Sequence, residues 1–358
     1  MKNELKDMIF SLAGLMSVSG HTTYSEAELR ELIGGYFDEV LVSPLKNYTF
    51  IRRCGKENAK KILIDTHFDE IGMIVTGIKD GGFLTVTNVG GLDTRILQAS
   101  EVVVYCRDKK KIYGVVGSTP PHLQRAGDAD KLVPIDEILI DTGYSKEELQ
   151  KHVSIGTPVG FMPKYSELKN GFIAGKGFDD KACGAIAALA IAKTPADELW
   201  GDVYLQFSNF EESGSYMSGA ATGAFATEPD CALVADVDLG RTPDTKDSET
   251  VKVGAGPSIA FSPLTDKRLT RIIESAAKEN GVPTQRTVAP SGTGTNTNVI
   301  GLVGRGIPTV DVGLPLKSMH TCAEVISLDD AKALKDLIKL FITSPEVAKT
   351  VSEVIDND

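Results

Sequence analysis

An α/β pattern and a β-rich pattern alternate along this chain of 358 residues, and their order restricts the fold. Residues 62–64 form a short, fully apolar run, as in a strand buried on both faces, and residues 179–193 form an alanine-rich helical pattern. Between about residues 73 and 160, short β-rich runs are separated by glycine or charged turns, without a good helical stretch before about residue 145. We therefore expect an α/β domain formed by residues 1–73 and 161–358, interrupted at 74–160 by a small antiparallel barrel or sandwich.

Composition and charge exclude several classes of partner. The formal net charge is -11, with 49 acidic against 38 basic residues, so nucleic acid and anionic membranes are not expected to bind. The sequence lacks a run of about 18 apolar residues that could span a bilayer. The amphipathic first helix carries charges that a secretory signal would not. Five scattered cysteines without a CxxC pattern favour reduced thiols and a cytoplasmic location.

Acids and histidines follow five of the predicted strands. In open α/β sheets the functional crevice lies outside the carboxyl ends of the strands, so these side chains are expected to meet. Any one of them alone has a simpler explanation as a turn former or a helix cap, and Asp179 or Asp180 would suit the start of the helix that follows. The set is harder to explain in that way, and its members are His67, Asp69, Asp179, Asp180, Glu211, Glu212, Asp236, Asp238 and His320.

Several carboxylates at one sheet edge require a positive charge between them, because otherwise their repulsion would raise their pKa values. Two divalent ions held by three carboxylates and two neutral imidazoles leave a net charge of about +1, which one hydroxide would neutralise. A mixture of histidine and carboxylate ligands favours zinc, cobalt or manganese over calcium or magnesium. The pattern thus predicts a two-metal centre.

The ordered segments "HFDEIG", "GFDDKACG", "FEESG", "ADV" and "MHTCAEV" resemble the motifs of a known enzyme family. They are similar to the co-catalytic metallo-aminopeptidases called glutamyl or tetrahedral aminopeptidases, some of which are labelled deblocking aminopeptidase or endoglucanase. The resemblance spans nearly the whole chain. It implies a mixed central sheet flanked by helices, with a small β-barrel-like domain at 74–160 that forms homo-oligomers, from dimers up to tetrahedral dodecamers.

The resemblance also implies a role for each site residue and two divalent metal ions per subunit, with zinc as the first choice and cobalt or manganese as alternatives. Peptides would be the substrates and would lose their N-terminal residues to a water activated by both metals. Glu211 would be the general base, passing a proton from that water to the departing amine. Asp69 would orient the imidazole of the first ligand. The implied ligands are His67 and Asp236 for one metal, Glu212 and His320 for the other, and Asp179 as the bridge.

Two departures from the family pattern leave the substrate preference open. The family usually has "SG.E" after the first helix, whereas this chain reads "SVSGHTTYSE" with its acid displaced to Glu26. The family also has "GTDA" in a late glycine-rich loop, where this chain has Asn296 in place of the aspartate. Because asparagine lacks the carboxylate charge, a catalytically divergent homologue that only binds or assembles stays an alternative.

Two other enzyme classes suit the sequence less well than an aminopeptidase. A glycosidase needs two carboxyl groups on either side of the scissile bond, about 5 to 9.5 Å apart, and the adjacent Glu211 and Glu212 suit that poorly. The sequence also has a single tryptophan, although sugar sites are usually aromatic. A cysteine hydrolase could be drawn with Cys183 near a helix start, but a packed cysteine explains that residue as well.

Overall fold

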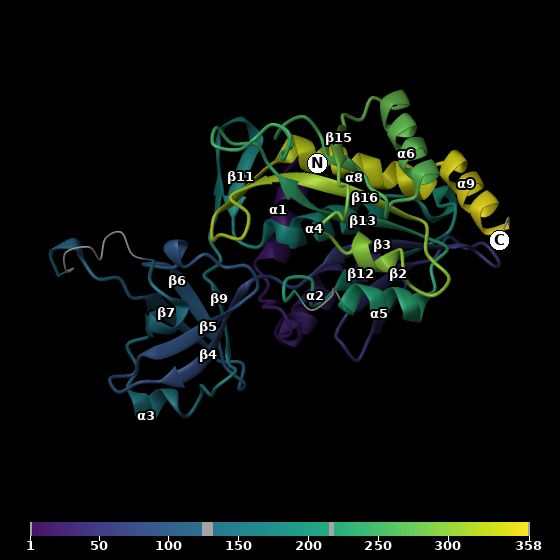
Figure 1. The fold of residues 1–358 in the computed structure, drawn as a ribbon. Helices are drawn as coiled ribbons and strands as arrows, with labels where there is room; N and C mark the ends of the chain where they lie inside the picture. Colours follow the sequence, from purple (N-terminus) through teal and green to yellow (C-terminus); the bar gives the residue numbers. More distant parts are fainter. Residues whose placement is uncertain (1, 124–131, 215–217, 357–358) are drawn as a thin grey trace.

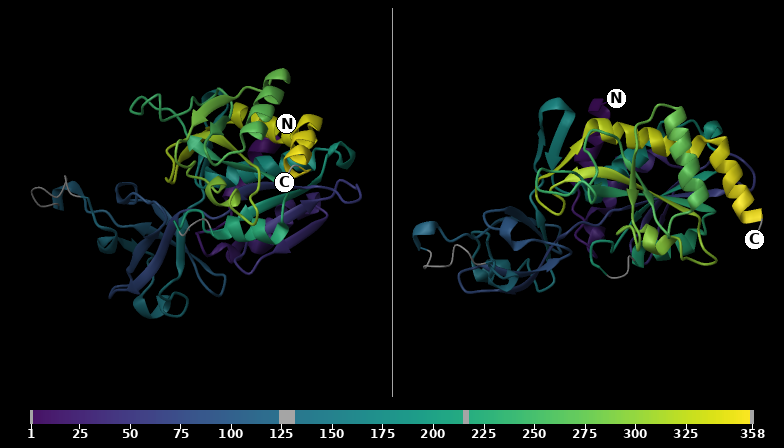
Figure 2. Two further views of the ribbon diagram at one scale, coloured as in Figure 1. Left: turned by 45° about the vertical axis from the view of Figure 1, so that its right-hand side comes forward. Right: turned by 45° about the horizontal axis from the view of Figure 1, so that its top comes forward.

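A computed structural model of the chain describes residues 2–123, 132–214 and 218–356. Among these residues, an eleven-stranded sheet is covered by helices, and a separate closed barrel is formed by six strands. Figures 1 and 2 show the barrel lying beside the helix-covered sheet. The chain enters the barrel between β3 and β4 and leaves it between β9 and β10. The expected mixed α/β fold with a barrel-like insertion is confirmed.

Four parallel strands form the centre of the large sheet. The order β1-β2-β12-β3-β13-β16-β17-β11-β10 places β12, β3, β13 and β16 side by side and parallel, with antiparallel strands outside them. β14 extends the sheet from β16 and pairs with β15. The carboxyl ends of the four central strands consequently lie at one edge. The strands are β1 Glu39–Val42, β2 Tyr48–Arg52, β3 Lys61–His67, β10 Tyr165–Glu167, β11 Phe172–Gly175, β12 Asp202–Ser208, β13 Cys231–Leu239, β14 Ser258–Phe261, β15 Gln285–Val288, β16 Thr309–Lys317 and β17 Glu324–Ser327.

Helices bury both faces of this sheet, as the continuous apolar strands require. On β3, Ile62 and Ile64 join the larger core with α1, α4 and α8, whereas Leu63 packs with α5 and α7 on the other face. The helices of this part are α1 Lys2–Ala13, α2 Glu26–Ile33, α4 Phe178–Ala192, α5 Ser218–Thr227, α6 Lys267–Glu279, α7 Thr297–Ile300, α8 Leu328–Thr343 and α9 Pro345–Asp356.

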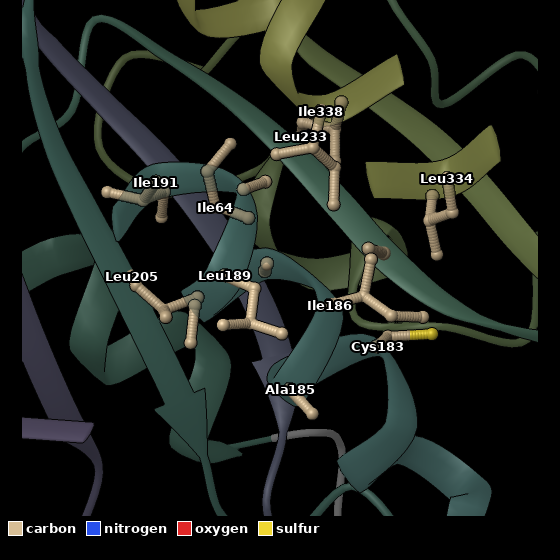
Figure 3. Packing of buried hydrophobic residues seen from close by; sticks show 14 of the residues in the cluster. Ile64, Cys183, Ala185, Ile186, Leu189, Ile191, Leu205, Leu233, Leu334 and Ile338 are labelled. Carbon is tan, nitrogen blue, oxygen red and sulfur yellow. The ribbon is translucent and has the colours of Figure 1, made fainter. Parts of the chain in front are cut away.

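The alanine-rich helix α4 lies close against the sheet because its side chains are small. Figure 3 shows Ile186 and Leu189 of α4 in the same buried cluster as Leu233 of β13 and Ile338 of α8. At Gly184 a Cβ atom would lie 2.4 Å from the ring of Phe207 on β12, so any larger residue would push helix and strand apart. This close packing fixes the start of α4, which reaches the functional edge.

The barrel has its own apolar core. Its strands run in the order β4-β5-β8-β7-β6-β9, and buried residues such as Met73, Val86, Val104 and Ile140 fill it. The elements are β4 Gly72–Ile78, β5 Leu84–Val89, β6 Glu101–Tyr105, β7 Lys111–Val116, β8 Leu139–Asp141, α3 Lys146–Leu149 and β9 Pro158–Phe161. The division of the chain into domains at residues 73/74 and 160/161 stays a prediction.

Two observations concern the surroundings in which the chain works. All five cysteines are free, as expected from their scatter in the sequence. None of the helices in the described ranges combines the length and the apolar character that crossing a bilayer requires.

Candidate metal centre and active site

Five chain segments converge at the carboxyl edge of the central strands. His67 ends β3, the pair Glu211 and Glu212 follows β12, Asp236 lies on β13, and His320 follows β16. The start of α4 contributes the sixth side chain. All six line one open pocket of about 430 Å³, and the sixth is Asp179.

The carboxylate of Asp179 lies between the two imidazoles. Its Oδ1 is 3.0 Å from Nε2 of His67, and its Oδ2 is 3.4 Å from Nε2 of His320. The helix-cap alternative for this residue is wrong, because Gly177 occupies the N-cap position and no side chain caps the helix there. Each imidazole has a further acid beside it. Glu212 Oε2 is 3.2 Å from His320 Nε2, and Asp236 Oδ1 is 3.7 Å from His67 Nε2.

Asp69 contacts the His67 ring through its main chain. Its carbonyl oxygen lies 2.8 Å from Nδ1 of His67, whereas its carboxylate Oδ1 is 3.8 Å away. The carboxylate instead accepts hydrogen bonds from the backbone N–H groups of Glu211 and Glu212, at 3.2 and 3.1 Å. Asp69 thus contacts the imidazole with its carbonyl oxygen and the turn after β12 with its carboxylate, and its role in orienting the ring stays a prediction.

Glu211 lies apart from the other acids. Its Oε2 is 4.0 Å from Nε2 of His67, and within the described part of the chain its carboxylate forms no hydrogen bond and no shorter ion pair. Burial, opposed by His67 and reinforced by the charge of Glu212, raises its pKa to about 7. A carboxyl group with such a pKa can accept and return a proton near neutral pH.

The pKa values of the other acids are shifted in different directions. Burial raises the pKa of Glu212 and, well above its usual range, that of Asp236. Burial acts on Asp179 in the same direction, but hydrogen bonds from His320 and His67 outweigh it and lower the pKa of Asp179. The hydrogen bonds with Asp179 and Glu212 raise the pKa of His320 to about 11. The site therefore retains protons as long as no other positive charge enters it.

These side chains fit a divalent cation. If the Nδ1–H of His67 donates a hydrogen bond to the Asp69 carbonyl oxygen, the ring is neutral and Nε2 faces the Asp179 carboxylate with a lone pair. Two acceptors 3.0 Å apart need a proton or a cation between them. Two groups of side chains offer ligand atoms within 4.8 Å of one another: His67 with Asp179 and Glu212, and His67 with Asp180 and Asp236.

The backbone is strained at two turns that carry these residues. Phe210, which precedes the two glutamates, has φ 69°, and His320 has φ 59°. Positive φ is rare for residues other than glycine and is found most often where a side chain must be aimed. The turn at residue 210 explains how Glu211 and Glu212 can both face the pocket, which an extended strand would not allow.

A loop of the barrel completes the pocket. Gly91 lines it, and a Cβ atom on Gly91 would lie 2.9 Å from Nδ1 of His320. A Cβ atom on Gly90 would lie 3.0 Å from the carbonyl oxygen of Glu212. The β-rich insertion thus contacts the site directly, and the sequence patterns gave no indication of this contact.

Glu324 supports the site without lining the pocket. Its Oε2 accepts hydrogen bonds from the backbone N–H groups of Phe178 and Asp179, and its Oε1 accepts one from His320. It therefore ties the start of α4 to the turn after β16. The residue lies inside the motif "MHTCAEV", but sequence reasoning assigned it no role.

Asp180, the neighbour of Asp179 among the strand-end acids, contacts the end of β3. Its Oδ2 accepts a hydrogen bond from the backbone N–H of His67 at 3.1 Å, and its Oδ1 has no hydrogen-bond partner among the described residues. Burial raises its pKa well above the usual range. It supports the end of β3 without lining the pocket.

A buried ion cluster fixes the segment before α4. Glu70 accepts hydrogen bonds from Lys176 at 2.8 and 2.9 Å, and Lys181 Nζ lies 2.9 Å from its Oε2. Glu70 also accepts the backbone N–H of Ser17. Burial lowers the pKa of Lys181 to about 7, with the charge of Lys176 acting in the same direction and Glu70 opposing them. The cluster joins α1, β3 and α4 next to Asp179.

The two departures from the family pattern lie away from the pocket. Nδ2 of Asn296 donates to Asp65 Oδ2 at 2.8 Å and to Ser208 Oγ at 2.9 Å, so a carboxylate lies opposite the asparagine. Asn296 is buried and does not line the pocket. Glu26 forms surface ion pairs with Arg30 and Lys46.

The structure gives little support to a cysteine hydrolase or a glycosidase. Cys183 is fully buried, and its pKa is raised well above the usual range by burial and by Asp180, so it is not an activated thiol. Its Sγ lies 3.4 Å from the carbonyl oxygen of Asp236. None of the described residues that line the pocket is phenylalanine, tyrosine or tryptophan, so the pocket offers no aromatic surface for a sugar.

The chain is similar in sequence to known peptidases. The sequence model of the M42 glutamyl aminopeptidase family matches residues 48–337. The chain is 30% identical over 328 residues to the lysyl aminopeptidase of Pyrococcus furiosus, which covers 90% of this chain and 92% of the relative.

Solved structures show the same likeness. An aminopeptidase from the archaeon Desulfurococcus kamchatkensis superposes with a TM-score of 0.88 at 29% identity, covering 98% of each chain. The TET1 peptidase of Pyrococcus horikoshii, which can assemble into a tetrahedron or a large octahedral shell, superposes at 0.82 with 29% identity, covering 95% of this chain and 99% of that one. These relatives support a hydrolase that acts on peptides. The resemblance drawn from the motifs is confirmed, and the chain belongs to the M42 glutamyl aminopeptidase family.

Proposed function

We propose that this peptidase removes N-terminal residues from peptides with two divalent metal ions and with Glu211 as the general base. One observation carries the proposal: the carboxylate of Asp179 lies between two imidazoles, and Glu211 faces the same pocket without a close contact to either. His67 and Asp236 would hold one metal, Glu212 and His320 the other, and Asp179 both. Such ions lower the pKa of water and polarise a carbonyl group.

The residues of the chain divide the remaining work. The Glu211 carboxylate accepts a proton from the attacking water and delivers it to the nitrogen of the departing amine, so no covalent intermediate with the protein is needed. Asp69 keeps the His67 ring in place through its carbonyl oxygen, and its carboxylate accepts a hydrogen bond from the backbone N–H of Glu211. Glu324 keeps His320 and Asp179 in register.

The test combines metal analysis with a substrate panel. Purified protein is analysed for metal and assayed on aminoacyl anilides, on an N-acetylated peptide and on an aryl glucoside, before and after chelation. We expect two metal equivalents, cleavage of free N-termini only, loss of activity with a chelator and recovery with zinc, cobalt or manganese. Two bound metals without cleavage of any peptide would instead identify a non-catalytic homologue.

We further propose that residues 74–160 form the oligomerisation domain. The TET1 peptidase of Pyrococcus horikoshii assembles into shells, and Tyr113 and Val115 on β7 are exposed apolar side chains of the barrel, with 59% and 47% of their surface accessible. Light scattering of the intact protein, compared with a Tyr113→Lys, Val115→Lys double variant, tests this role. A wild-type monomer would contradict it. The free cysteines suit the cytoplasm that we propose as its location.

A further inference from the structure

A second hollow adjoins the candidate active site. It has a volume of about 400 Å³ and shares Val237, Asp238, Thr293 and Thr295 with the pocket that holds the histidines and acids. Strands β13, β14, β15 and β16 line it, together with residues 247–250, Ala289, Thr293 and Thr295. A substrate held at the histidines can therefore extend a side chain into this side pocket.

Two carboxylates in the side pocket have no cation beside them. Asp311 is only 5% exposed, and its Oδ2 accepts hydrogen bonds from the hydroxyls of Thr295 at 2.5 Å and Thr297 at 2.7 Å. Asp238 accepts hydrogen bonds from Ser258 Oγ at 2.6 Å and from a backbone N–H. Within the described ranges, neither carboxylate forms an ion pair with lysine, arginine or histidine.

The outer charges of the side pocket are already balanced. Arg286 lies at its wall but binds Glu274 through two hydrogen bonds. Asp247 pairs with Arg241 at 3.0 Å, and Glu249 pairs with Lys246 at 2.8 Å. Of the acids that line the side pocket, the two inner ones, Asp238 and Asp311, are therefore those without a cationic partner among the described residues. Hydroxyl groups solvate a buried carboxylate only in part, so a cation that enters gains a strong charge-assisted contact.

We propose that this side pocket receives the side chain of the substrate's N-terminal residue and selects a long cationic one, lysine or arginine. The inference rests on the proposed aminopeptidase function and specifies its substrate class. The aliphatic stem of such a side chain passes Val237, and its charged end reaches Asp238 and Asp311. A glutamate side chain would meet two buried acids and is rejected.

Matched substrates isolate the charge. The ratio of kcat/KM for lysyl anilide to that for norleucyl anilide compares side chains of similar length that differ in the terminal ammonium group. We expect a ratio of about tenfold or more in the wild type, and still lower rates with glutamyl anilide. Asp311→Asn and Asp238→Asn should each bring the ratio close to one. Glu249→Gln, at the exposed and already paired outer wall, should keep it. Equal lysyl and norleucyl rates in the wild type would overturn the inference.

A binding measurement separates this inference from the proposed function. Calorimetry on the intact metal-loaded protein compares L-lysine with L-norleucine and L-glutamate and does not require turnover. Tighter binding of L-lysine that is lost in Asp311→Asn supports the side pocket even if no anilide is cleaved. Equal binding of the three amino acids refutes it even if the enzyme is an active aminopeptidase. Should Asp311→Asn not fold, the same comparison is made with Asp238→Asn.

Discussion

Replacing each of the two adjacent glutamates by glutamine tests the proposed mechanism most directly. Glu211→Gln keeps the shape of the side chain and its backbone hydrogen bond to Asp69, but removes the proton acceptor. Glu212→Gln makes the same chemical change one residue later, at a carboxylate that lies 3.2 Å from His320 Nε2. We expect the first variant to retain metal and lose turnover, and the second to lose both.

The size of the first effect follows from the environment of Glu211. It has no contact shorter than 4.0 Å to an imidazole among the described residues, so its loss should not weaken the ligand set. A positioned general base contributes about 10²- to 10⁴-fold, which corresponds to about 3 to 5 kcal/mol of activation free energy. Because burial raises the pKa of Glu211 to about 7 without metal, and bound cations lower it, kcat/KM should rise with pH with an inflection at or below about 7.

The assay measures kcat, KM and metal content of both variants over pH 5 to 9. Glu211→Gln should keep two metal equivalents, lower kcat by about 100-fold or more, and lack the rising limb of the pH profile. Activity within tenfold of the wild type, or loss of metal from Glu211→Gln, would refute the assignment of the base. Equal metal loss from both variants would show that the pair acts as one ligand unit.

Three further outcomes are expected. The folded pKa of His320 is about 11, above its ordinary 6.5, so the stability that it contributes is complete below about pH 6.5 and is lost as the pH rises toward 11. Thermal melts of the metal-free protein should therefore fall from pH 7 to pH 9, and a flat profile would contradict the pairing. Glu70→Gln leaves Lys176 and Lys181 buried without a carboxylate and should lower the free energy of unfolding by about 3 to 5 kcal/mol in urea titrations, whereas a loss below about 1 kcal/mol would exclude a structural role for the cluster. Gly91→Ala places a methyl group 2.9 Å from His320 Nδ1 and should weaken metal binding in chelator competition, whereas Gly117→Ala in the same barrel, with a nearest contact of 3.4 Å, should not.

The class of fold was predictable because it depends on local patterns. A strand such as residues 62–64 must be covered on both faces. The change from an α/β pattern to a β-rich pattern at about residue 73 marks a part of the chain with its own core. The ligand candidates were predictable too, because parallel strands deliver their carboxyl ends to one edge. Which atoms of Asp69 contact the imidazole was not predictable, because spacing along a strand says nothing of competing donors. The backbone N–H groups of the turn after β12 bind its carboxylate, and its carbonyl oxygen contacts the ring.

The residues that support the site could not be predicted from the sequence, because their partners lie far away along the chain. Glu324 and Glu70 act on segments that are more than 100 residues away, and no local pattern marks such a partner. The contact of Gly91 with His320 depends on how the barrel lies against the sheet, which neither part encodes alone. The significance of Asn296 also changed, because only the packing shows Asp65 opposite it.

By itself, the sequence determined the kinds of elements, the family and the set of chemical groups at the site, since these follow from residue types, periodicity and order. Tertiary structure alone decided which carboxylate lies between the imidazoles, which lies apart from them, and which acids line a side pocket without a cation. The physical reason is that protonation, hydrogen bonding and cation affinity depend on distances of a few ångströms between segments far apart in the chain. The two adjacent glutamates illustrate it: they are alike in the sequence, and a single left-handed residue at position 210 helps to give them different surroundings.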